Sequence, residues 1–471
     1  MTFTPYRIHF FGLAESWLGK LLGVENQANW SAAQPAPTAK VADAKWVTSA
    51  GRVLLVWVPC YTLMGYRFGP SGMALAASSL LAAVWLISLR SAFAAVHFTL
   101  GPAVRCAVGT LTGMIGVSAL VLWVPGLGMS LPTILALTLS VFTLTTIWES
   151  VSQRVVGKRR VLVVGTSTCA DAVADAISFE GSAPFTVVGA VDDEPEDAAR
   201  LGSVAELSRV IDEQRPDLIV LTDGESSTRA LDRLLDAPSG GLRIVGHAHF
   251  FDHAFGRIPL DDLKPTWFMS IFHLWQRPYT RFAKRTFDIV CATLLLVLSA
   301  PLLLVIAGLV RLSSGPVIFR QTRVGEGGKL FTIFKFRTMR RDAEEPGRPA
   351  FAALDDPRVT RMGRVLRRTH LDELPQLWDV LKGDMSIVGP RPERPEFIPM
   401  LQEAVPFFTR RLLVKPGITG WAQLRRDYAS DADGAAEKLS YDLWYVRHRN
   451  LVVDLAICAK TLSSVLLRPG R

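Results

Sequence analysis

The sequence has few cysteines and no pattern that would give them a structural role. Five are spread over 471 residues, and neither their odd number nor their wide spacing indicates a disulfide framework or a zinc site. Most lie within apolar runs, so we expect buried small side chains. We also expect no signal peptide at the amino terminus, because charges interrupt the apolar residues of 1–22 and no small-residue cleavage site follows. Residues 25–44 indicate a flexible lead-in.

Acidic residues are in deficit, with 43 Asp and Glu against 52 Lys and Arg, which gives a net charge of +9. A basic protein can bind nucleic acid, anionic lipid or a phosphate-rich substrate. Here the basic residues flank apolar segments and fill one Arg-rich stretch, which favours membrane lipid and phosphate and predicts no nucleic-acid partner. Hydrophobic residues make up 49% of the chain and are clustered, as in membrane proteins.

Four long apolar runs contain almost no charge. They occupy residues 51–68, 72–90, 103–125 and 129–149. Each is long enough to cross about 30 Å of hydrocarbon as a helix. We therefore assign 1–50 to an N-terminal lead-in and 51–150 to a bundle of four transmembrane helices. The loop between the last two runs has no positive charge, whereas basic residues surround the opposite ends. The amino terminus and everything after residue 150 should thus be cytoplasmic, in a bacterial inner membrane.

Residues 158–265 alternate between strand and helix patterns. Buried strands are predicted at 160–164, 185–191, 217–222 and 242–246, and a helix at 170–178. This alternation indicates a Rossmann-like α/β cytoplasmic domain. The turn after the first strand keeps Gly165 but lacks the second and third glycines of G-x-G-x-x-G, which let a pyrophosphate approach the backbone. A regulatory or assembly role is therefore favoured over dinucleotide binding.

Three histidines cluster in the run H-A-H-F-F-D-H, namely His247, His249 and His253. The run lacks cysteines and a fixed helical spacing such as H-E-x-x-H, which disfavours metal binding. We expect ordinary polar loop or surface histidines.

A fifth apolar segment, 287–310, is as hydrophobic as the four runs, and hydropathy alone predicts a transmembrane helix. Basic residues flank it on both sides, however, which places both ends in the cytoplasm. Pro301 removes a hydrogen bond in mid-segment and bends the helix axis. We therefore predict a re-entrant membrane helix that is broken at Ser299 and Pro301. The residues expected at the membrane interface just precede or begin it: Lys284, Arg285 and Asp288.

The acidic pair Asp372-Glu373 stands in the run L-D-E-L-P-Q. Because proline is tolerated in the first helical turn, Pro375 predicts that a helix starts near Asp372. Neighbours on a helix point about 100° apart, so one acid can attack a substrate while the other holds a cation. Four arginines upstream can converge on the same anionic group, since guanidinium suits phosphate oxygens. They are Arg361, Arg364, Arg367 and Arg368.

Such a set fits phosphoryl transfer from a diphosphate, which needs charge neutralisation and in-line positioning more than acid–base catalysis. A carboxylate is ionised at pH 7 and attacks phosphorus without a general base. The alternative is a surface helix with a solvated acidic start, which would be preferred for Asp-Glu alone. The surrounding motifs, which follow an apolar hairpin, argue against it.

Several ordered motifs resemble the polyisoprenyl-phosphate hexose-1-phosphate transferases, which are large monotopic phosphoglycosyl transferases. They are K-R-x-x-D at 284–288, G-P-V-I-F-R-Q-T-R-V-G at 315–325, K-F-R-T-M at 335–339, L-D-E-L-P-Q at 371–376, K-G-D-M-S-I-V-G-P-R-P at 382–392 and K-P-G-I-T-G at 415–420. The match covers 281–471, which we assign to a C-terminal, mainly α catalytic domain that includes the re-entrant helix. The preceding domains match the family's long form more loosely. One departure is Asp379, where the family often has asparagine.

The resemblance implies transfer of hexose-1-phosphate from a UDP-sugar donor to undecaprenyl phosphate, with release of UMP, as the first membrane step of exopolysaccharide or O-antigen synthesis. Asp372 would attack the β-phosphate and form a phosphosugar-aspartate, and Glu373 would hold Mg²⁺. The run P-R-P-E-R-P-E-F at 390–397 looks like the glucose-1-phosphate branch, while galactose remains open. A homodimer is expected, although no motif encodes the oligomeric state. The implied phosphate-binding residues are Arg367, Arg391, Lys335, Arg337, Arg368 and Arg323.

Two other functions were weighed against this one. A nucleotide-sugar dehydratase or epimerase would need an intact NAD loop and a Tyr-x-x-x-Lys pair, and the chain has neither. A catalytically inactive membrane scaffold would have lost an acid of the pair, yet both are present. The last apolar stretch, 452–467, fits either an interfacial or a core helix.

Overall fold

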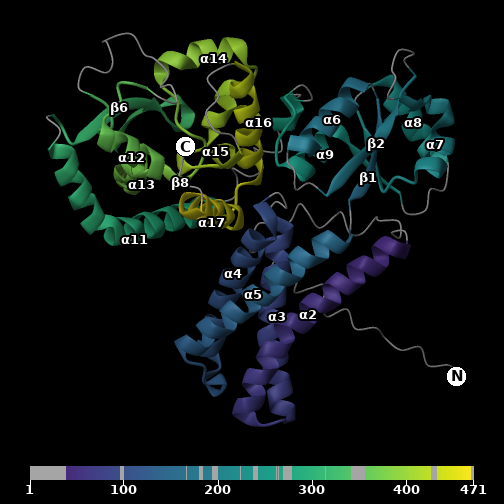
Figure 1. Cartoon of the computed structure of the whole chain (residues 1–471), viewed down its shortest axis with the longest axis horizontal. Helices are drawn as coiled ribbons and strands as arrows, with labels where there is room; N and C mark the ends of the chain where they lie inside the picture. The colour runs from purple at the N-terminus through teal and green to yellow at the C-terminus, as the bar shows by residue number, and fades with distance from the viewer. Residues whose placement is uncertain are drawn as a thin grey trace. The chain divides into compact units, whose positions relative to one another are not determined.

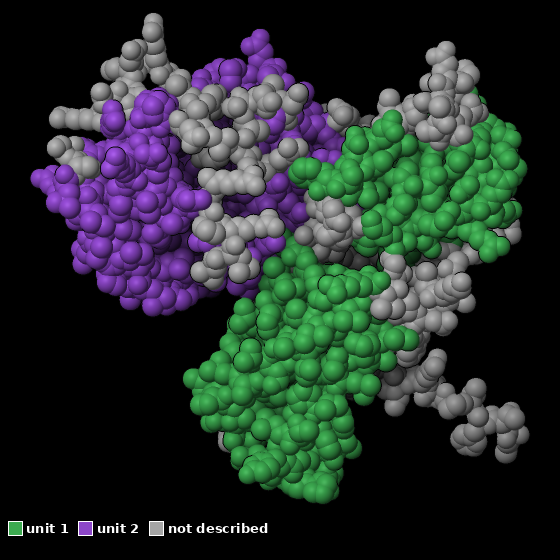
Figure 2. All heavy atoms as spheres, in the orientation of Figure 1, with its two compact units in different colours: residues 1–250 green, residues 251–471 purple. Residues whose placement is uncertain are grey.

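The computed structural model describes residues 39–95, 100–156, 158–260, 263–268, 278–312, 315–340, 356–425 and 432–467, with short gaps at 166, 180–183, 194–199, 223, 237–241 and 264. The lead-in predicted for residues 1–50 therefore lies outside the described residues as far as residue 38. The chain divides into two compact units, 1–250 and 251–471 (Figures 1 and 2).

Four long apolar helices open the first unit. They are α2 (Ala39–Phe68), α3 (Gly72–Ala95), α4 (Gly101–Trp123) and α5 (Leu131–Val156), with the short turn η3 (Pro125–Leu127) between the last two. They pack around a common core that includes Val56, Trp85 and Val141. Their outer faces are also apolar, and Ile115 and Leu122 are 65% and 81% exposed. Helices that are apolar all round, with the length to cross a membrane, fit the predicted spans.

A five-stranded parallel sheet follows in the same unit. Its spatial order is β3 (Arg200–Gly202), β2 (Phe185–Val191), β1 (Arg159–Val164), β4 (Leu218–Leu221) and β5 (Arg243–Gly246). The helices that connect the strands are α6 (Ser167–Phe179), α7 (Leu207–Gln214) after the turn η4 (Val204–Glu206), and α8 (Glu225–Asp236). Leu162, Val191 and Ile219 form part of the buried core. The Rossmann-like prediction is confirmed as a parallel sheet domain. Of its five strands only the three-residue β3 was not predicted.

The helix α9 (His247–Phe255) contains the three histidines of the H-A-H-F-F-D-H run. Of the expected loop or surface histidines, the loop is wrong, because Phe250, Phe251 and Phe255 are each at most 4% exposed and anchor this segment as a helix. His253 is exposed and does lie at the surface. Apolar side chains one turn apart outweighed the polar residues between them.

The second unit is mainly α-helical, as predicted. Its further elements are η5 (Pro265–Phe268), α11 (Pro278–Arg311), β6 (Ile318–Val324), η6 (Glu326–Gly328), β7 (Leu330–Phe336), α12 (Arg361–Thr369), η7 (Leu371–Gln376), α13 (Leu377–Lys382), β8 (Ser386–Val388), η8 (Pro395–Phe397), α14 (Ile398–Ala404), η9 (Phe408–Leu413), β9 (Gly417–Thr419), α15 (Trp421–Arg425), α16 (Ala432–His448) and α17 (Leu451–Leu467). β6 and β7 form an antiparallel hairpin, and β8 pairs with β9 in parallel. Gly389 follows β8 where the Lys415 carbonyl leaves no room for a Cβ.

The apolar helix α11 contacts its own unit near both of its ends. Near the start, Ser386 Oγ donates to the Asp288 carboxylate at 2.9 Å. Near the end, Ile306 and Val310 pack with Phe336 in a buried cluster. Between these contacts the side chains are exposed, with Leu298 at 67% and Leu304 at 75%. Figure 1 shows that the ribbon of α11 changes direction along its length. The segment is nevertheless a single helix from Pro278 to Arg311, with Pro301 inside it.

The terminal helix α17 is half buried. Val453 and Ile457 are at most 3% exposed, whereas Leu462 is 61% exposed. Of the two alternatives for 452–467, an interfacial or a core helix, the first half of α17 is therefore a core helix.

Candidate active site

The acidic pair is placed by a tight junction between two short helices. Thr360 caps α12 by accepting a hydrogen bond from the Gly363 N–H at 2.9 Å, and the helix ends at His370 in a left-handed conformation with φ of 55°. The chain then turns directly into η7, whose first turn holds Asp372 and Glu373. The predicted start near Asp372 is correct, but the turn is a 3₁₀ helix and α13 begins only at Leu377. Both carboxylates are consequently drawn inward, at 8% and 9% exposure.

Glu373 lies between two cationic side chains. Lys335 Nζ is 2.6 Å from Oε1, and Arg391 Nη2 donates to the same oxygen at 2.9 Å. Oε2 has a longer contact, 3.5 Å from Arg391 Nη1. Burial by itself raises the pKa of Glu373, but Arg391 and Lys335 outweigh it and hold that pKa well below its ordinary value. Glu373 is therefore an anion that joins β7 to the loop after β8.

Asp372 has a different environment, as expected for neighbours on a helical turn. Burial and the adjacent Glu373 charge raise its pKa, whereas Lys335, Arg367 and Arg391 act in the opposite direction. The described residues show no hydrogen bond to its carboxylate. Asp372 is thus a desolvated acid in a positive field, which suits attack on an anionic phosphorus centre.

The upstream arginines divide into one inward and three outward side chains. Arg367 is partly buried and donates from Nε to Thr338 Oγ1 at 2.9 Å. Arg361, Arg364 and Arg368 are exposed on α12. The structure therefore brings Arg367, rather than all four, toward the acidic pair, and phosphate binding by Arg368 stays a prediction.

Two further arginines that were predicted to bind phosphate form hydrogen bonds with other residues of the protein. Arg337 is 9% exposed, and its Nη2 lies 3.4 Å from the Val310 carbonyl at the end of α11. Arg323 donates to Gln321 Oε1 at 2.6 Å and to the Pro392 carbonyl at 3.0 Å. Arg323 thus supports the loop that carries Arg391, and for both arginines phosphate contact remains a prediction.

The predicted interface residues at the start of α11 turn toward the protein. Arg285 donates from its terminal nitrogens to the carbonyls of Val380 and Leu381, at 2.7 and 2.6 Å. Asp288 is 2% exposed and also accepts from the Ile387 N–H at 3.0 Å. These contacts connect α11 to α13 and β8, both of which follow the acidic pair in sequence. Proximity to lipid headgroups stays a prediction.

Sequence reasoning missed a buried ionic group behind Arg391. Arg411 is 4% exposed and contacts Glu393 at 3.1 Å and Asp442 at 2.7 Å. Its Nη2 also donates to the Arg391 carbonyl at 3.1 Å. Arg411 belongs to none of the motifs, and the only available signal was its place four residues before K-P-G-I-T-G. Burial, which separates Arg411 from its exposed neighbour Arg410, is not readable from composition.

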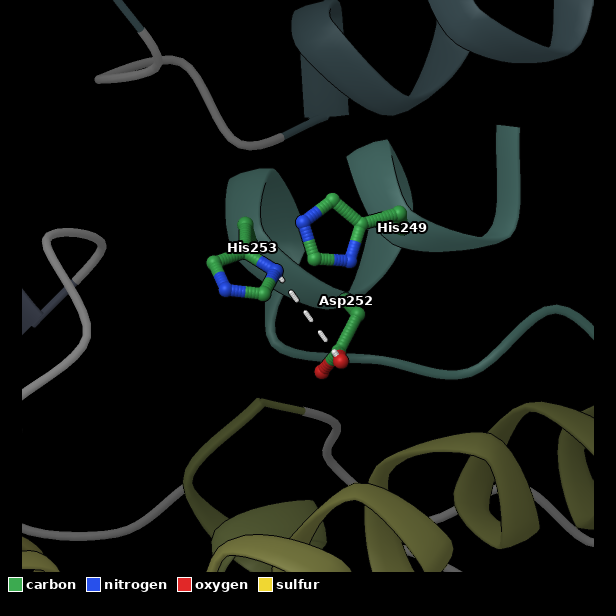
Figure 3. Close-up of side chains that lie close together, drawn as sticks. All are labelled: His249, Asp252 and His253. Carbon is green, nitrogen blue, oxygen red and sulfur yellow. Dashed lines mark ion pairs between the residues drawn. The ribbon is translucent and has the colours of Figure 1, made fainter. Parts of the chain in front are cut away.

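A second polar cluster lies on one turn of α9. Ligand atoms of His249, Asp252 and His253 lie within 4.8 Å of one another, and Figure 3 shows the Asp252 carboxylate beside the His253 ring. Arg447 Nη1 is 3.4 Å from the same carboxylate. The other Asp252 oxygen lies 3.4 Å from His448 Nε2, so both carboxylate oxygens face side chains of α16 and the cluster is explained as a helix-to-helix contact.

Comparison with known proteins adds a family to this geometry. The family described as bacterial sugar transferase matches residues 279–468. The chain is 42% identical to the UDP-N-acetylgalactosamine-undecaprenyl-phosphate N-acetylgalactosaminephosphotransferase of Aeromonas hydrophila over 212 residues. This aligned region is 45% of this chain and 49% of that protein. Over 318 residues it is 33% identical to the undecaprenyl-phosphate glucose phosphotransferase of Komagataeibacter xylinus, with 64% and 58% covered.

A third relative extends the match through most of the chain. The UDP-glucose:undecaprenyl-phosphate glucose-1-phosphate transferase of Escherichia coli K12 is 33% identical over 315 residues, which are 65% of this chain and 67% of that protein. The chain spans about half the length of the first two relatives, at 49% and 58%. The matched region contains the buried acidic pair, its cationic neighbours and α11. On these grounds the chain belongs to the bacterial sugar transferase family.

Proposed function

We propose that this protein transfers hexose-1-phosphate from a UDP-sugar to undecaprenyl phosphate at the cytoplasmic face of a bacterial inner membrane. The observation that carries the proposal is the pair Asp372 and Glu373, buried together among Lys335, Arg367 and Arg391. Three cations around two acids leave a net positive site for a diphosphate. The relatives' names, which specify undecaprenyl-phosphate sugar phosphotransferases, support the same reaction.

In the first step an Asp372 carboxylate oxygen bonds to the β-phosphorus of the donor, and the bond from that phosphorus to the bridging oxygen breaks. UMP leaves with the electron pair, and the sugar phosphate is held as an acyl phosphate on Asp372. In the second step an oxygen of undecaprenyl phosphate attacks the same phosphorus and the aspartate oxygen leaves. Neither nucleophile needs a general base, which agrees with a site built from cations and carboxylates.

Magnesium is proposed as the cofactor, with Glu373 as its protein ligand. The fit is reasonable because Glu373 Oε2 makes only a 3.5 Å contact with Arg391, while Oε1 takes the two short ones. Mg²⁺ is bound in proteins by one or two carboxylates together with substrate phosphates. When bound, the ion would neutralise diphosphate charge, whereas Lys335 and Arg391 orient Glu373 and Arg367 adds positive charge beside Asp372.

The contacts of α11 support the proposed membrane placement. A straight 34-residue helix would span about 51 Å, yet both ends of α11 contact the same unit. The exposed apolar middle therefore enters and leaves one face of the bilayer in our proposal, with the break at Ser299 and Pro301. The lipid acceptor would then reach the acidic pair along the surface from which α11 enters.

Glucose is the proposed sugar, as the 390–397 run and the names of two relatives suggest, with galactose as the alternative. The N-acetylgalactosamine transferase among the relatives requires that this donor be tested as well. A homodimer and a regulatory or assembly role for the sheet domain also remain proposals.

The test uses the full chain in detergent with Mg²⁺, undecaprenyl phosphate, and UDP-glucose, UDP-galactose or UDP-N-acetylgalactosamine. We expect UMP release with one donor, and its loss in Asp372→Asn. The exposed Asp384→Asn is the matched control and should retain activity. Donor with a labelled sugar but no lipid should leave label on the wild-type protein and none on Asp372→Asn. Folded protein that releases no UMP from any donor would refute the proposal and favour a scaffold.

A further inference from the structure

One end of the four-helix bundle holds a charged group to which every helix contributes. Arg52 comes from α2, Phe93 from α3, Arg105 from α4 and Glu149 from α5. The guanidinium carbons of Arg52 and Arg105 lie 4.6 and 4.5 Å from the centre of the same Phe93 ring. No motif covers these residues, and the proposed reaction does not use them.

The charges in this group do not balance. Arg52 Nε donates to Glu149 Oε1 at 2.7 Å, so the only carboxylate already has a guanidinium partner. Arg105 is 8% exposed, and its Nε has no hydrogen-bond partner among the described residues. The Phe93 ring attracts a cation but does not neutralise it. A buried guanidinium is therefore left with surplus positive charge inside an apolar bundle, where an unpaired charge is costly.

The group lies near one end of the helices that are long and apolar enough to span a membrane. Arg52 follows the start of its span, Arg105 follows the start of α4, and Glu149 precedes the end of the α5 span. At 1.5 Å per residue each is within roughly 8 Å of the span end. By the distribution of basic residues this is the cytoplasmic end. Basic pockets between transmembrane helices on that side bind anionic lipid headgroups.

A purely structural alternative is a clamp that holds the four helices together. The Arg52–Glu149 pair and the bond from Trp148 Nε1 to the Thr48 carbonyl, at 2.9 Å, already join α2 to α5 at this level. A clamp needs no second guanidinium. Glu149 attracts Arg105 and Arg52 repels it, but one carboxylate cannot balance two guanidinium groups, and one positive charge stays in excess. The surplus charge indicates an anion that approaches from the bilayer.

We propose that Arg105, supported by Arg52 and Phe93, binds the phosphate headgroup of a lipid at the cytoplasmic rim of the four-helix bundle. A guanidinium fork matches two phosphate oxygens, and the surrounding helices offer an apolar wall for the acyl or prenyl chain. Two lipids carry this chemistry, a phospholipid such as phosphatidylglycerol and undecaprenyl phosphate. The site is separate from the acidic pair and does not depend on the transfer reaction.

The experiment is native mass spectrometry of the full chain in detergent, with added phosphatidylglycerol, undecaprenyl phosphate or the uncharged lipid diacylglycerol. Arg105→Gln removes the guanidinium that is proposed to bind the phosphate. The matched control is Arg154→Gln, which removes an exposed charge from the last turn of α5, at the same end of the bundle. We expect one anionic lipid to bind to wild type and Arg154→Gln, and to bind roughly tenfold or more weakly to Arg105→Gln. Size-exclusion elution of each variant reports folding.

The lipid arms distinguish the sources. Preference for undecaprenyl phosphate over phosphatidylglycerol at equal concentration would assign an acceptor-holding site, and equal binding would assign a general phospholipid site. If Arg105→Gln does not fold, the lipid binding of the wild-type protein alone tests the proposal. Wild-type protein that binds neither anionic lipid in preference to diacylglycerol overturns it. Equal lipid binding by a folded Arg105→Gln overturns it as well and leaves the clamp.

Discussion

Lys284 and Asp454 form an ion pair, with Nζ 2.7 Å from Oδ2, that joins the start of α11 to α17. Tyr445 donates to the other carboxylate oxygen at 2.9 Å, and Lys284 also donates to the Val388 carbonyl at 3.1 Å. Asp454 is 1% exposed, so its charge depends on these partners. Lys284, in the second turn of α11, is thereby bonded to β8, the strand that leads to Arg391.

Removing Lys284 should destabilise the catalytic unit strongly. Lys284→Met leaves Asp454 buried without its cation, which costs roughly 3–5 kcal/mol in comparable buried pairs. The exposed Arg281→Met removes a neighbouring positive charge and should change stability by less than about 0.5 kcal/mol. Thermal unfolding of both variants in one detergent provides the measurement, and equal midpoints would show that the pair contributes nothing.

Arg411 should act as a positioning residue for Arg391. Arg411→Met leaves Glu393 and Asp442 without their shared cation and removes the bond to the Arg391 carbonyl. We expect a loss of roughly 3–5 kcal/mol. At temperatures where the variant is folded, UMP release should fall chiefly in kcat/KM.

The control for Arg411 is its neighbour. Arg410 is exposed and contacts only the Phe268 ring among the interactions described, at 5.4 Å, so Arg410→Met should cost at most about 1 kcal/mol. Partial recovery of activity in Arg411→Lys would separate charge from fork geometry. An Arg411→Met variant with wild-type kcat/KM would contradict the positioning role.

Asp379 is fully buried, accepts a hydrogen bond from the Phe334 N–H at 3.1 Å and forms an ion pair with Lys382, whose Nζ is 2.9 Å from Oδ1. It holds β7 one residue before Lys335. Asp379→Asn keeps an oxygen for the N–H and should cost about 1 kcal/mol, whereas Asp379→Leu leaves that N–H unsatisfied and should cost roughly 2–4 kcal/mol. Chemical denaturation of the two variants checks the difference, and a Leu variant as stable as Asn would exclude this role.

The sequence predicted the elements whose signal is local. Some predictions depend on periodicity or on the chemistry of one residue, and these elements lie where predicted. They are the four apolar runs, the strands of the sheet, and the helical turn that Pro375 predicted near Asp372. Asp372 and Glu373 were found because they are adjacent and stand in a specific motif. Their unequal environments followed from helical geometry alone.

What the sequence did not reveal depends on which side of an element faces inward. Of four arginines on α12, only Arg367 turns toward the acidic pair, and the helix phase is set by packing of Leu366 and Gly363. Arg285 and Asp288 looked like interface residues because they flank an apolar run, yet they bond to protein backbone. The H-A-H-F-F-D-H run forms a helix rather than a loop because its phenylalanines are buried, and the histidine pattern does not reveal that burial.

The Lys335–Glu373–Arg391 group predicts a specific dependence of stability on pH. The folded-state pKa of Glu373 lies below its unfolded value, so its ion pairs contribute stability above the unfolded pKa, near 4.3, and lose it as pH falls through the folded pKa. Glu373→Gln should therefore be less stable than wild type by a constant amount between about pH 5 and 8, and the gap should narrow only below about pH 4. Urea titrations across this range provide the measurement, and a gap that closes near neutral pH would contradict it.

Pro301 should decide whether α11 returns to the face it enters. The ring cannot donate a backbone hydrogen bond. Two residues earlier, Ser299 Oγ donates to the Leu295 carbonyl at 2.6 Å, a contact that also favours bending. Pro301→Leu restores the missing donor and should straighten the helix into a crossing. The measurement is labelling of Leu312→Cys with a membrane-impermeant maleimide in spheroplasts, in a chain whose five native cysteines are replaced. We expect no labelling with Pro301 and labelling with Pro301→Leu, while Gly126→Cys, in the α4–α5 turn, should be labelled in both. Labelling at 312 with Pro301 present would mean that α11 crosses the bilayer, which its contacts at both ends argue against.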